Sequence, residues 1–113
     1  MNIVSTANAE RYMWGEGCGG WHLLRSPGLS IIQERVPSGK GEVRHYHEKA
    51  EQFFYVLSGI ATMETDKGVF EIGPDHGMHI APGISHRLSN RGESDLVFLV
   101  CSAPMAHGDR VII

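Results

Sequence analysis

The sequence predicts an all-β domain that folds as an antiparallel sandwich or barrel. It contains about nine short apolar runs, separated by glycine, proline, aspartate and serine residues, as expected for strands joined by tight turns. No stretch shows the 3.6-residue apolar period of an amphipathic helix. With 113 residues, 42% of them hydrophobic, the chain is long enough for one domain whose core needs no disulfide.

The first twenty residues are rich in glycine and predict an N-terminal arm. These glycines all lie between Trp14 and Trp21, but no strand is expected directly before them and no Lys-Ser or Lys-Thr pair is present, so we do not expect a phosphate loop. The tryptophans are expected to dock on the domain or on a partner subunit. We therefore divide the chain into an arm, residues 1–20, and a β domain, residues 21–113.

The expected strands are apolar or alternating runs bounded by turn residues. They cover residues 21–24, 29–36, 43–47, 53–57, 60–65, 69–72, 78–80, 86–90 and 96–102. Ser58-Gly59 predicts a hairpin between two of them. The apolar end of the chain, residues 111–113, predicts a tail that docks on the domain.

One expected strand is apolar on both faces. Alternation along it places Gln52, Phe54 and Val56 on one side. The other side is formed by Phe53, Tyr55 and Leu57. A strand that is apolar on both faces needs cover on each, and a second subunit is one source of that cover.

Charge and cysteine content exclude several classes of protein. A formal net charge of -3 without a lysine or arginine cluster argues against nucleic-acid binding. No run of about 18 apolar residues predicts a membrane span, and the N-terminus lacks the basic and apolar regions of a signal peptide, so we expect a cytoplasmic protein. Cys18 and Cys101 lie far apart, outside any CxxC spacing, and are expected to be free thiols.

Histidine is the unusual residue type in this composition, with seven copies. His45 and His47 are separated by one residue in an expected strand, so their imidazoles should point to the same side. His86 follows a Pro-Gly turn further along the chain. His79 alternates with apolar neighbours and His76 lies at a turn, so both are expected on the surface. The two remaining histidines, His22 and His107, have no assigned role.

These residues fit two motifs of the cupin family, which the chain resembles. The first motif is Gly, five residues, His-x-His, three or four residues, Glu, six residues, Gly; the second ends Pro-x-Gly, two residues, His, three residues, Asn. The matching positions are Gly39, His45, His47, Gln52, Gly59, Gly83, His86 and Asn90. Two departures are present: Gln52 replaces the usual glutamate, and the second motif begins Asp75-His76 rather than Gly-Asp, with Ala81-Pro82-Gly83 in place of Pro-x-Gly.

The resemblance implies a jelly-roll β-barrel, the double-stranded β-helix, with a divalent transition metal inside. Its ligands would be His45, His47, Gln52 and His86, and the ion would be Fe, Mn, Ni, Co or Zn. An amide oxygen carries no charge, so the ion would keep its full +2 and favour anionic or chelating ligands. Glu51 is the alternative fourth ligand if the strand contains a bulge, although alternation turns it away.

Two functions follow from the resemblance. One is a metal-dependent enzyme of dioxygenase or isomerase type that acts on a small polar chelating molecule, and the other is a non-catalytic binding or sensor cupin. No general base is evident in the sequence, so no catalytic residue is assigned. Small cupins that resemble this one commonly form homodimers by crossing N-terminal strands, which implies a homodimer with an exchanged arm. For the histidines, the alternative is a metal-free pocket lined by hydrogen-bonded rings.

Overall fold

The structure is a computed structural model that describes residues 1–106 and 108–113, so His107 lies outside it. The described residues form eleven strands and no helix. The strands are β1 (Glu10–Trp14), β2 (Cys18–Arg25), β3 (Ser30–Val36), β4 (His45–His47), β5 (Glu51–Ser58), β6 (Ala61–Thr65), β7 (Gly68–Ile72), β8 (Gly77–Ile80), β9 (His86–Ser89), β10 (Leu96–Ala103) and β11 (Arg110–Ile112). Within these residues, nothing forms a helix suited to crossing a bilayer.

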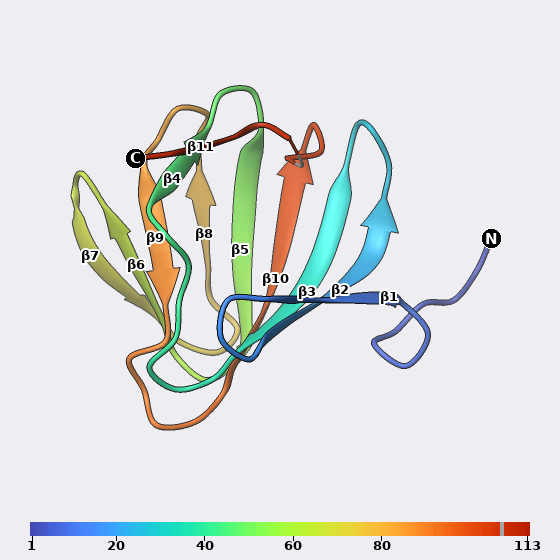
Figure 1. The fold of residues 1–113 in the computed structure, drawn as a ribbon, viewed down its shortest axis with the longest axis horizontal. Helices are drawn as coiled ribbons and strands as arrows, with labels where there is room; N and C mark the ends of the chain where they lie inside the picture. Colours follow the sequence, from blue (N-terminus) through green and yellow to red (C-terminus); the bar gives the residue numbers. More distant parts are fainter. Residues whose placement is uncertain (107) are drawn as a thin grey trace.

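The strands form two antiparallel sheets that face each other (Figure 1). The larger sheet has the order β1-β2-β3-β10-β5-β8, and the smaller has the order β11-β4-β9-β6-β7. The core between the sheets includes Val56 and Phe98 from the larger and Met63 and Leu88 from the smaller. The predicted antiparallel jelly-roll fold is confirmed, with the two sheets hydrogen-bonded separately rather than as one closed barrel.

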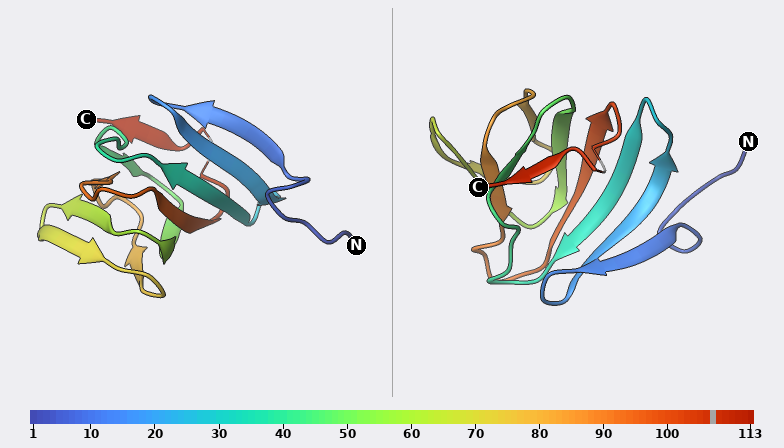
Figure 2. Two further views of the ribbon diagram at one scale, coloured as in Figure 1. Left: turned by 90° about the horizontal axis from the view of Figure 1, so that it is seen from below. Right: turned by 45° about the horizontal axis from the view of Figure 1, so that its top comes forward.

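The N-terminal region differs from the sequence prediction. The predicted boundary at residue 20 falls inside β2, which begins at Cys18, and β1 adds a further strand before it. Figure 2 shows these two strands as a hairpin at one edge of the larger sheet, with the first residues extending away from it. Glycines weaken an isolated strand, which hid the start of β2 before the predicted strand at residues 21–24; here Gly20 is buried beneath a side chain of β1. Exchange of this region in a dimer stays a prediction.

The C-terminal tail docks as predicted. β11 pairs with β4, so that Ile112 lies opposite His45 and Arg110 opposite His47 (Figure 2). The pairing adds an edge strand to the smaller sheet next to the two motif histidines. It also brings Arg110 to the mouth of the cavity described below.

Alternation along β5 is confirmed. Gln52, Phe54 and Val56 are buried on the inner face, whereas Phe53 and Leu57 on the outer face are 43% and 39% exposed. The inner face therefore supplies core and cavity. The outer face remains apolar and largely uncovered within one chain.

The motif asparagine has a structural role. Asn90 is 1% exposed, and its amide donates to the backbone oxygens of Val36 and Ser94 at 2.9 and 2.8 Å. Its side-chain oxygen accepts the N–H of Gly92 at 2.9 Å. These bonds fasten the turn between β9 and β10 to the end of β3, which fixes how the two sheets meet at this end.

Candidate metal site and cavity

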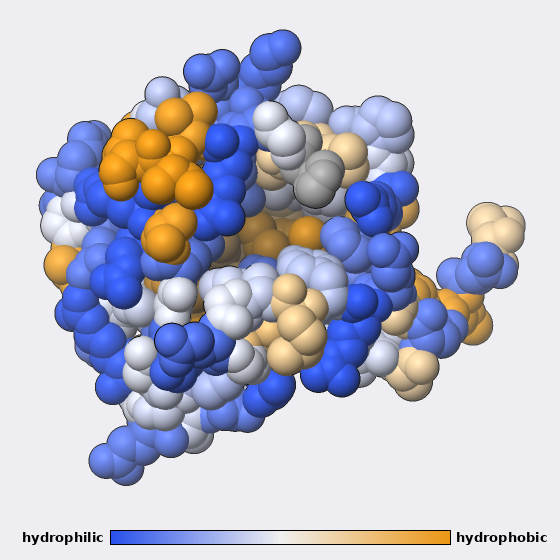
Figure 3. Space-filling model, viewed as in Figure 1, coloured by the Kyte–Doolittle hydropathy of each residue, from blue (hydrophilic) through white to orange (hydrophobic). Residues whose placement is uncertain are grey.

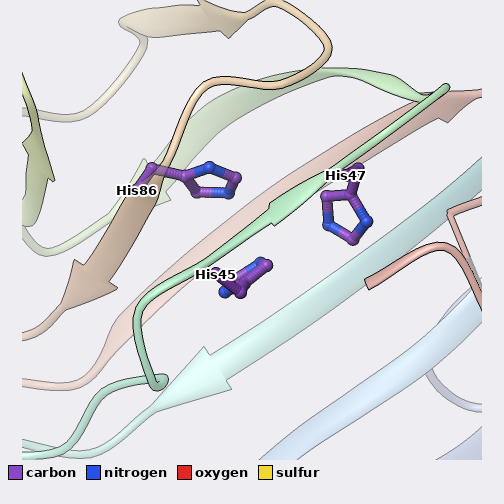
Figure 4. Close-up of side chains that lie close together, drawn as sticks. All are labelled: His45, His47 and His86. Carbon is purple, nitrogen blue, oxygen red and sulfur yellow. The ribbon is translucent and has the colours of Figure 1, made fainter. Parts of the chain in front are cut away.

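Three histidines converge in the space between the sheets. His45 and His47 point inward from β4, and the pairing of β4 with β9 places His86 opposite His45. The ring centroid of His45 lies 5.1 Å from that of His47 and 4.5 Å from that of His86. One nitrogen from each ring lies within 4.8 Å of the others, and Figure 4 shows the side chains around one shared space. This group could hold a metal ion.

Local backbone contacts set the positions and orientations of these rings. Gly83, in a left-handed conformation with φ of 80°, donates its N–H to the backbone oxygen of His47 at 2.7 Å, which ties the turn before β9 to β4. The Nδ1 of His45 lies 2.8 Å from the Val43 oxygen, and that of His86 lies 2.9 Å from the Ile84 oxygen. A carbonyl only accepts, so each Nδ1 carries the proton and each Nε2 keeps a lone pair.

Burial keeps these rings neutral. It lowers the pKa of His45 to about 4, against the opposing effect of the Val43 carbonyl, and electrostatic interactions with the His86 ring and the Arg110 guanidinium add to the lowering. Burial also lowers the pKa values of His47 and His86. A metal binds only deprotonated imidazole, so all three rings are in the ligating form at neutral pH.

Gln52 contributes a polar atom that has no partner. Its Nε2 donates to the Ser102 hydroxyl at 3.1 Å, while its buried Oε1 has no hydrogen-bond partner among the described residues. The Nε2 of His86 is also buried and has no hydrogen-bond partner among the described residues. Buried polar atoms are normally paired, so the unpaired amide oxygen and imidazole nitrogen fit the donor set of a transition metal ion.

The alternative ligand lies elsewhere. Glu51 is exposed on the outer face of β5, where its Oε1 lies 2.8 Å from the Nε2 of His79. No bulge separates Glu51 from Gln52 in the pairing of β5 with β10. His79 and His76 are both exposed, as the sequence predicted.

A cavity of about 450 Å³ opens beside the histidine group. His45, His47 and Gln52 line one side of it, and Figure 3 shows the hollow on the face turned toward the viewer. We call His45 and His47, together with the adjacent His86, which does not itself line the cavity, the histidine wall. The cavity is also lined by Tyr12 and Glu34 of the larger sheet and by Glu42, which precedes β4; we call these three residues the carboxyl wall.

Sequence reasoning missed the carboxyl wall. Burial raises the pKa of Glu34 to about 7 and that of Glu42 to about 8; the Glu34 charge adds to the rise at Glu42. Tyr12 donates its hydroxyl to Glu34 at 3.1 Å. One signal was available: Glu34 alternates with Ile32 and Val36, so its strand predicts an inward-facing carboxyl group. Tyr12 offered no such signal, because β1 itself was not predicted.

The fold and the histidine geometry agree with a comparison to known families. The family model described as the cupin domain matches residues 32–102. The chain belongs to the cupin family. Its match spans β3 to β10, which includes the four predicted metal ligands and leaves β1, β2 and β11 outside.

Named relatives extend this result. An uncharacterized protein of Methanocaldococcus jannaschii is 32% identical over 85 residues, covering 74% of this chain and 68% of the relative. Polyketide synthase CurC of Streptomyces cyaneus is 29% identical over 79 residues; this covers 70% of the chain but only 49% of that protein, so the chain spans about half the length of CurC. Among solved structures, the polyketide cyclase RemF of Streptomyces resistomycificus superposes with a TM-score of 0.86 at 19% identity, covering 100% of this chain and 85% of RemF.

Proposed function

We propose that this cupin is a metal-dependent enzyme of isomerase type that acts on a small, oxygen-rich molecule. His45, His47, Gln52 and His86 would hold one divalent transition metal ion, of Fe, Mn, Ni, Co or Zn, and the ion would polarise a substrate oxygen. The observation that carries this proposal is the convergence of one nitrogen from each of three neutral imidazoles within 4.8 Å of the others, with a buried, unpaired His86 nitrogen. The unpaired oxygen of Gln52 supports its place as the fourth donor.

The charge of the site supports the substrate class. Three imidazoles and an amide are all neutral, so a bound ion would keep its +2 charge and attract carboxylates, enediols or dicarbonyl compounds. The names of CurC and RemF both refer to polyketides, which are chains of carbonyl groups with acidic C–H bonds between them. Rearrangement of such compounds needs proton transfer rather than an oxidant, which favours an isomerase over a dioxygenase.

Metal binding is the first test. Untagged protein should contain about one metal ion per chain by elemental analysis, and chelator-treated protein should take up Zn²⁺ or Ni²⁺ with the same stoichiometry in calorimetry. A His79→Ala variant, which removes an exposed histidine, should bind equally well. If no ion binds at this ratio, the proposal is wrong.

Catalysis is tested separately from binding. Iron-loaded protein with diketones, thiols and enediols should consume no oxygen above the rate of the metal-free protein, whereas a dioxygenase would. Stoichiometric ligand binding without conversion of any tested carbonyl compound would instead identify a binding or sensor cupin.

We also propose that the protein is a cytoplasmic homodimer. Phe53 and Leu57 are exposed on the outer face of β5 in one chain, which supports a second subunit that covers this face. The β1–β2 hairpin lies at the edge of the same sheet, where it could cross between subunits. Light scattering after gel filtration should give twice the 12.5 kDa chain mass. A Phe53→Glu variant should shift the protein toward monomer; a monomeric unsubstituted chain would contradict the dimer.

A further inference from the structure

Three strands bring Tyr12 and Glu34 together across the larger sheet. Tyr12 on β1 lies opposite Gly20 on β2, and Gly20 lies opposite Glu34 on β3. The three residues therefore share one row and one face of the sheet. The Tyr12 hydroxyl crosses this row to lie 3.1 Å from Oε2 of Glu34.

Gly20 makes the crossing possible. A Cβ atom at this position would lie 2.2 Å from Cζ of Tyr12 and 2.5 Å from its hydroxyl oxygen, well inside any real contact. Only glycine lets the tyrosine ring lie flat over the backbone of β2 and reach the next strand. The glycine thus serves a specific placement of Tyr12, with the hydroxyl aimed into the cavity rather than at solvent.

The pair shares a cavity with the candidate metal site. Tyr12 and Glu34 line the same 450 Å³ space as His45, His47 and Gln52. The titratable and charged groups around Glu34 come from every neighbouring element and are Glu10 and Tyr12 on β1, His22 and Arg25 on β2, Glu42 before β4, His45 and His47 on β4, and Arg110 on β11. Burial raises the pKa of Glu34, and the Tyr12 hydrogen bond and the Arg110 charge partly oppose it.

We propose that Glu34 is the catalytic base of this cupin, and that Tyr12 is the residue that positions it, for substrates with an acidic C–H next to a carbonyl. This inference rests on the proposed metal-dependent function. The Glu34 carboxylate takes the proton from that C–H, and the electron pair of the broken bond shifts to form a C–C double bond while the carbonyl π pair moves onto its oxygen. Return of a proton to the same carbon, on either face, re-forms the carbonyl from the oxygen electron pair and completes a hydrogen exchange or an epimerisation in which nothing is oxidised.

Glu42 is less suited to this role. Its Oε1 accepts the backbone N–H of Leu88 at 3.0 Å, and its own N–H donates to the Leu88 oxygen, so the residue is held against β9. Glu34 has a hydroxyl partner instead, which can adjust its hydrogen as the carboxyl group gains and loses a proton. A pKa near neutrality also matches a base that must work in both directions.

Hydrogen exchange tests the proposal without knowledge of the natural substrate. The Zn-loaded 113-residue chain in D₂O is mixed with pyruvate or dihydroxyacetone, and loss of the C–H signal is followed by proton NMR. Glu34→Gln should slow the exchange at least about a hundredfold, and Tyr12→Phe about tenfold. Gly20→Ala should resemble Tyr12→Phe, because it displaces the ring without removing a functional group. The matched controls Glu71→Gln and Tyr55→Phe, both outside the cavity, should stay within about twofold of the unsubstituted rate.

A second measurement does not depend on turnover. Protein labelled with ¹³C at the glutamate side-chain carboxyl should show one resonance that titrates near pH 7, that disappears in Glu34→Gln, and that shifts to higher pH in Tyr12→Phe, since the tyrosine hydrogen bond lowers the Glu34 pKa. The low-pH limb of the exchange rate should move with it. A merely structural tyrosine would leave both midpoints unchanged.

The outcomes separate this inference from the proposed function. Metal content is measured for every variant: if the unsubstituted protein binds no ion, the proposed function fails. If it binds one ion per chain, but neither probe exchanges or Glu34→Gln exchanges at the unsubstituted rate, the assignment of Glu34 is overturned while the metal site stands.

Discussion

The two walls of the cavity are built from different kinds of sequence information. The histidine wall depends on short spacing: two histidines one residue apart on β4, and a third brought alongside by a single strand pairing. The carboxyl wall depends on register across three strands, which joins Tyr12 to Glu34 over a gap of 22 residues. The walls also differ in charge, because one holds neutral bases and the other holds acids. The comparison teaches that motif spacing can mark metal ligands in a sequence, whereas the contact between Tyr12 and Glu34 becomes visible only in the register of the strands.

Removing a histidine should break the metal site most severely. His47→Ala deletes one of three converging imidazoles, and we expect metal affinity to fall at least about a hundredfold, more than the loss of a supporting hydrogen bond would cause. Calorimetry with Zn²⁺ measures the change, and circular dichroism checks that the variant is folded. His79→Ala is the matched control, since His79 is exposed on the outer face of β8. Equal affinities for both variants would exclude His47 as a ligand.

The two walls should respond to pH in opposite directions in chelator-treated protein. Burial lowers the histidine pKa values, to about 4 for His45. Below about pH 6.5 the unfolded chain therefore binds more protons than the folded chain. The free energy of unfolding should thus fall as pH decreases from about 6.5 toward 4. Glu34 and Glu42 have raised pKa values of about 7 and 8, so the folded chain binds more protons and stability falls as pH rises from about 4.5 to 8.

Glu34→Gln isolates the carboxyl contribution. At pH 8.5 the variant should be more stable than the unsubstituted protein by about 1 to 2 kcal/mol, after allowance for partial exposure, and near pH 4.5 the two should be equal. Urea unfolding at both pH values measures the difference. Glu71→Gln, at an exposed position on β7, should change stability little at either pH. A Glu34→Gln variant that is less stable at pH 8.5 would show that the ionised carboxyl group is better satisfied than its burial implies.

The sequence predicted the histidine wall and most of the strands for physical reasons that do not extend to the carboxyl wall. Period-two alternation places His45, His47 and Gln52 without knowledge of any partner strand. Tyr12 and Glu34 meet only because β1 and β3 both align with Gly20, and register between distant strands leaves no local pattern. Gly20, which permits the contact between Tyr12 and Glu34, belongs to the glycine-rich stretch that predicted an N-terminal arm. The prediction of an arm therefore concealed β1, the strand that carries Tyr12.

Substitution at Gln52 tests whether this residue is a metal ligand together with the three histidines. Gln52→Glu would replace a neutral oxygen donor with a charged one, and we expect metal affinity to rise about tenfold, since affinity follows the charge of the ligands. Gln33→Glu adds the same charge on β3, outside the cavity, and should leave affinity unchanged. Zinc competition with a chelator measures both. If Gln52→Glu left the metal affinity unchanged, Gln52 would not be a ligand. Because Glu51 faces outward, the three histidines would then be the protein ligands.

The smallest expected effect concerns the orientation of that amide. Ser102 on β10 is 2% exposed, and its hydroxyl accepts from Nε2 of Gln52 at 3.1 Å, which fixes the side-chain oxygen as the free end of the amide. Ser102→Ala removes this constraint, so the amide can rotate and metal affinity should fall about threefold. This loss is smaller than the usual loss of about tenfold or more for a residue that hydrogen-bonds a metal ligand, because the Gln52 amide is uncharged. Ser58→Ala, exposed at the end of β5, is the control. If Ser102→Ala weakened binding as much as His47→Ala, the hydroxyl itself would have to be a ligand, because an orienting contact costs no more than the donor it orients.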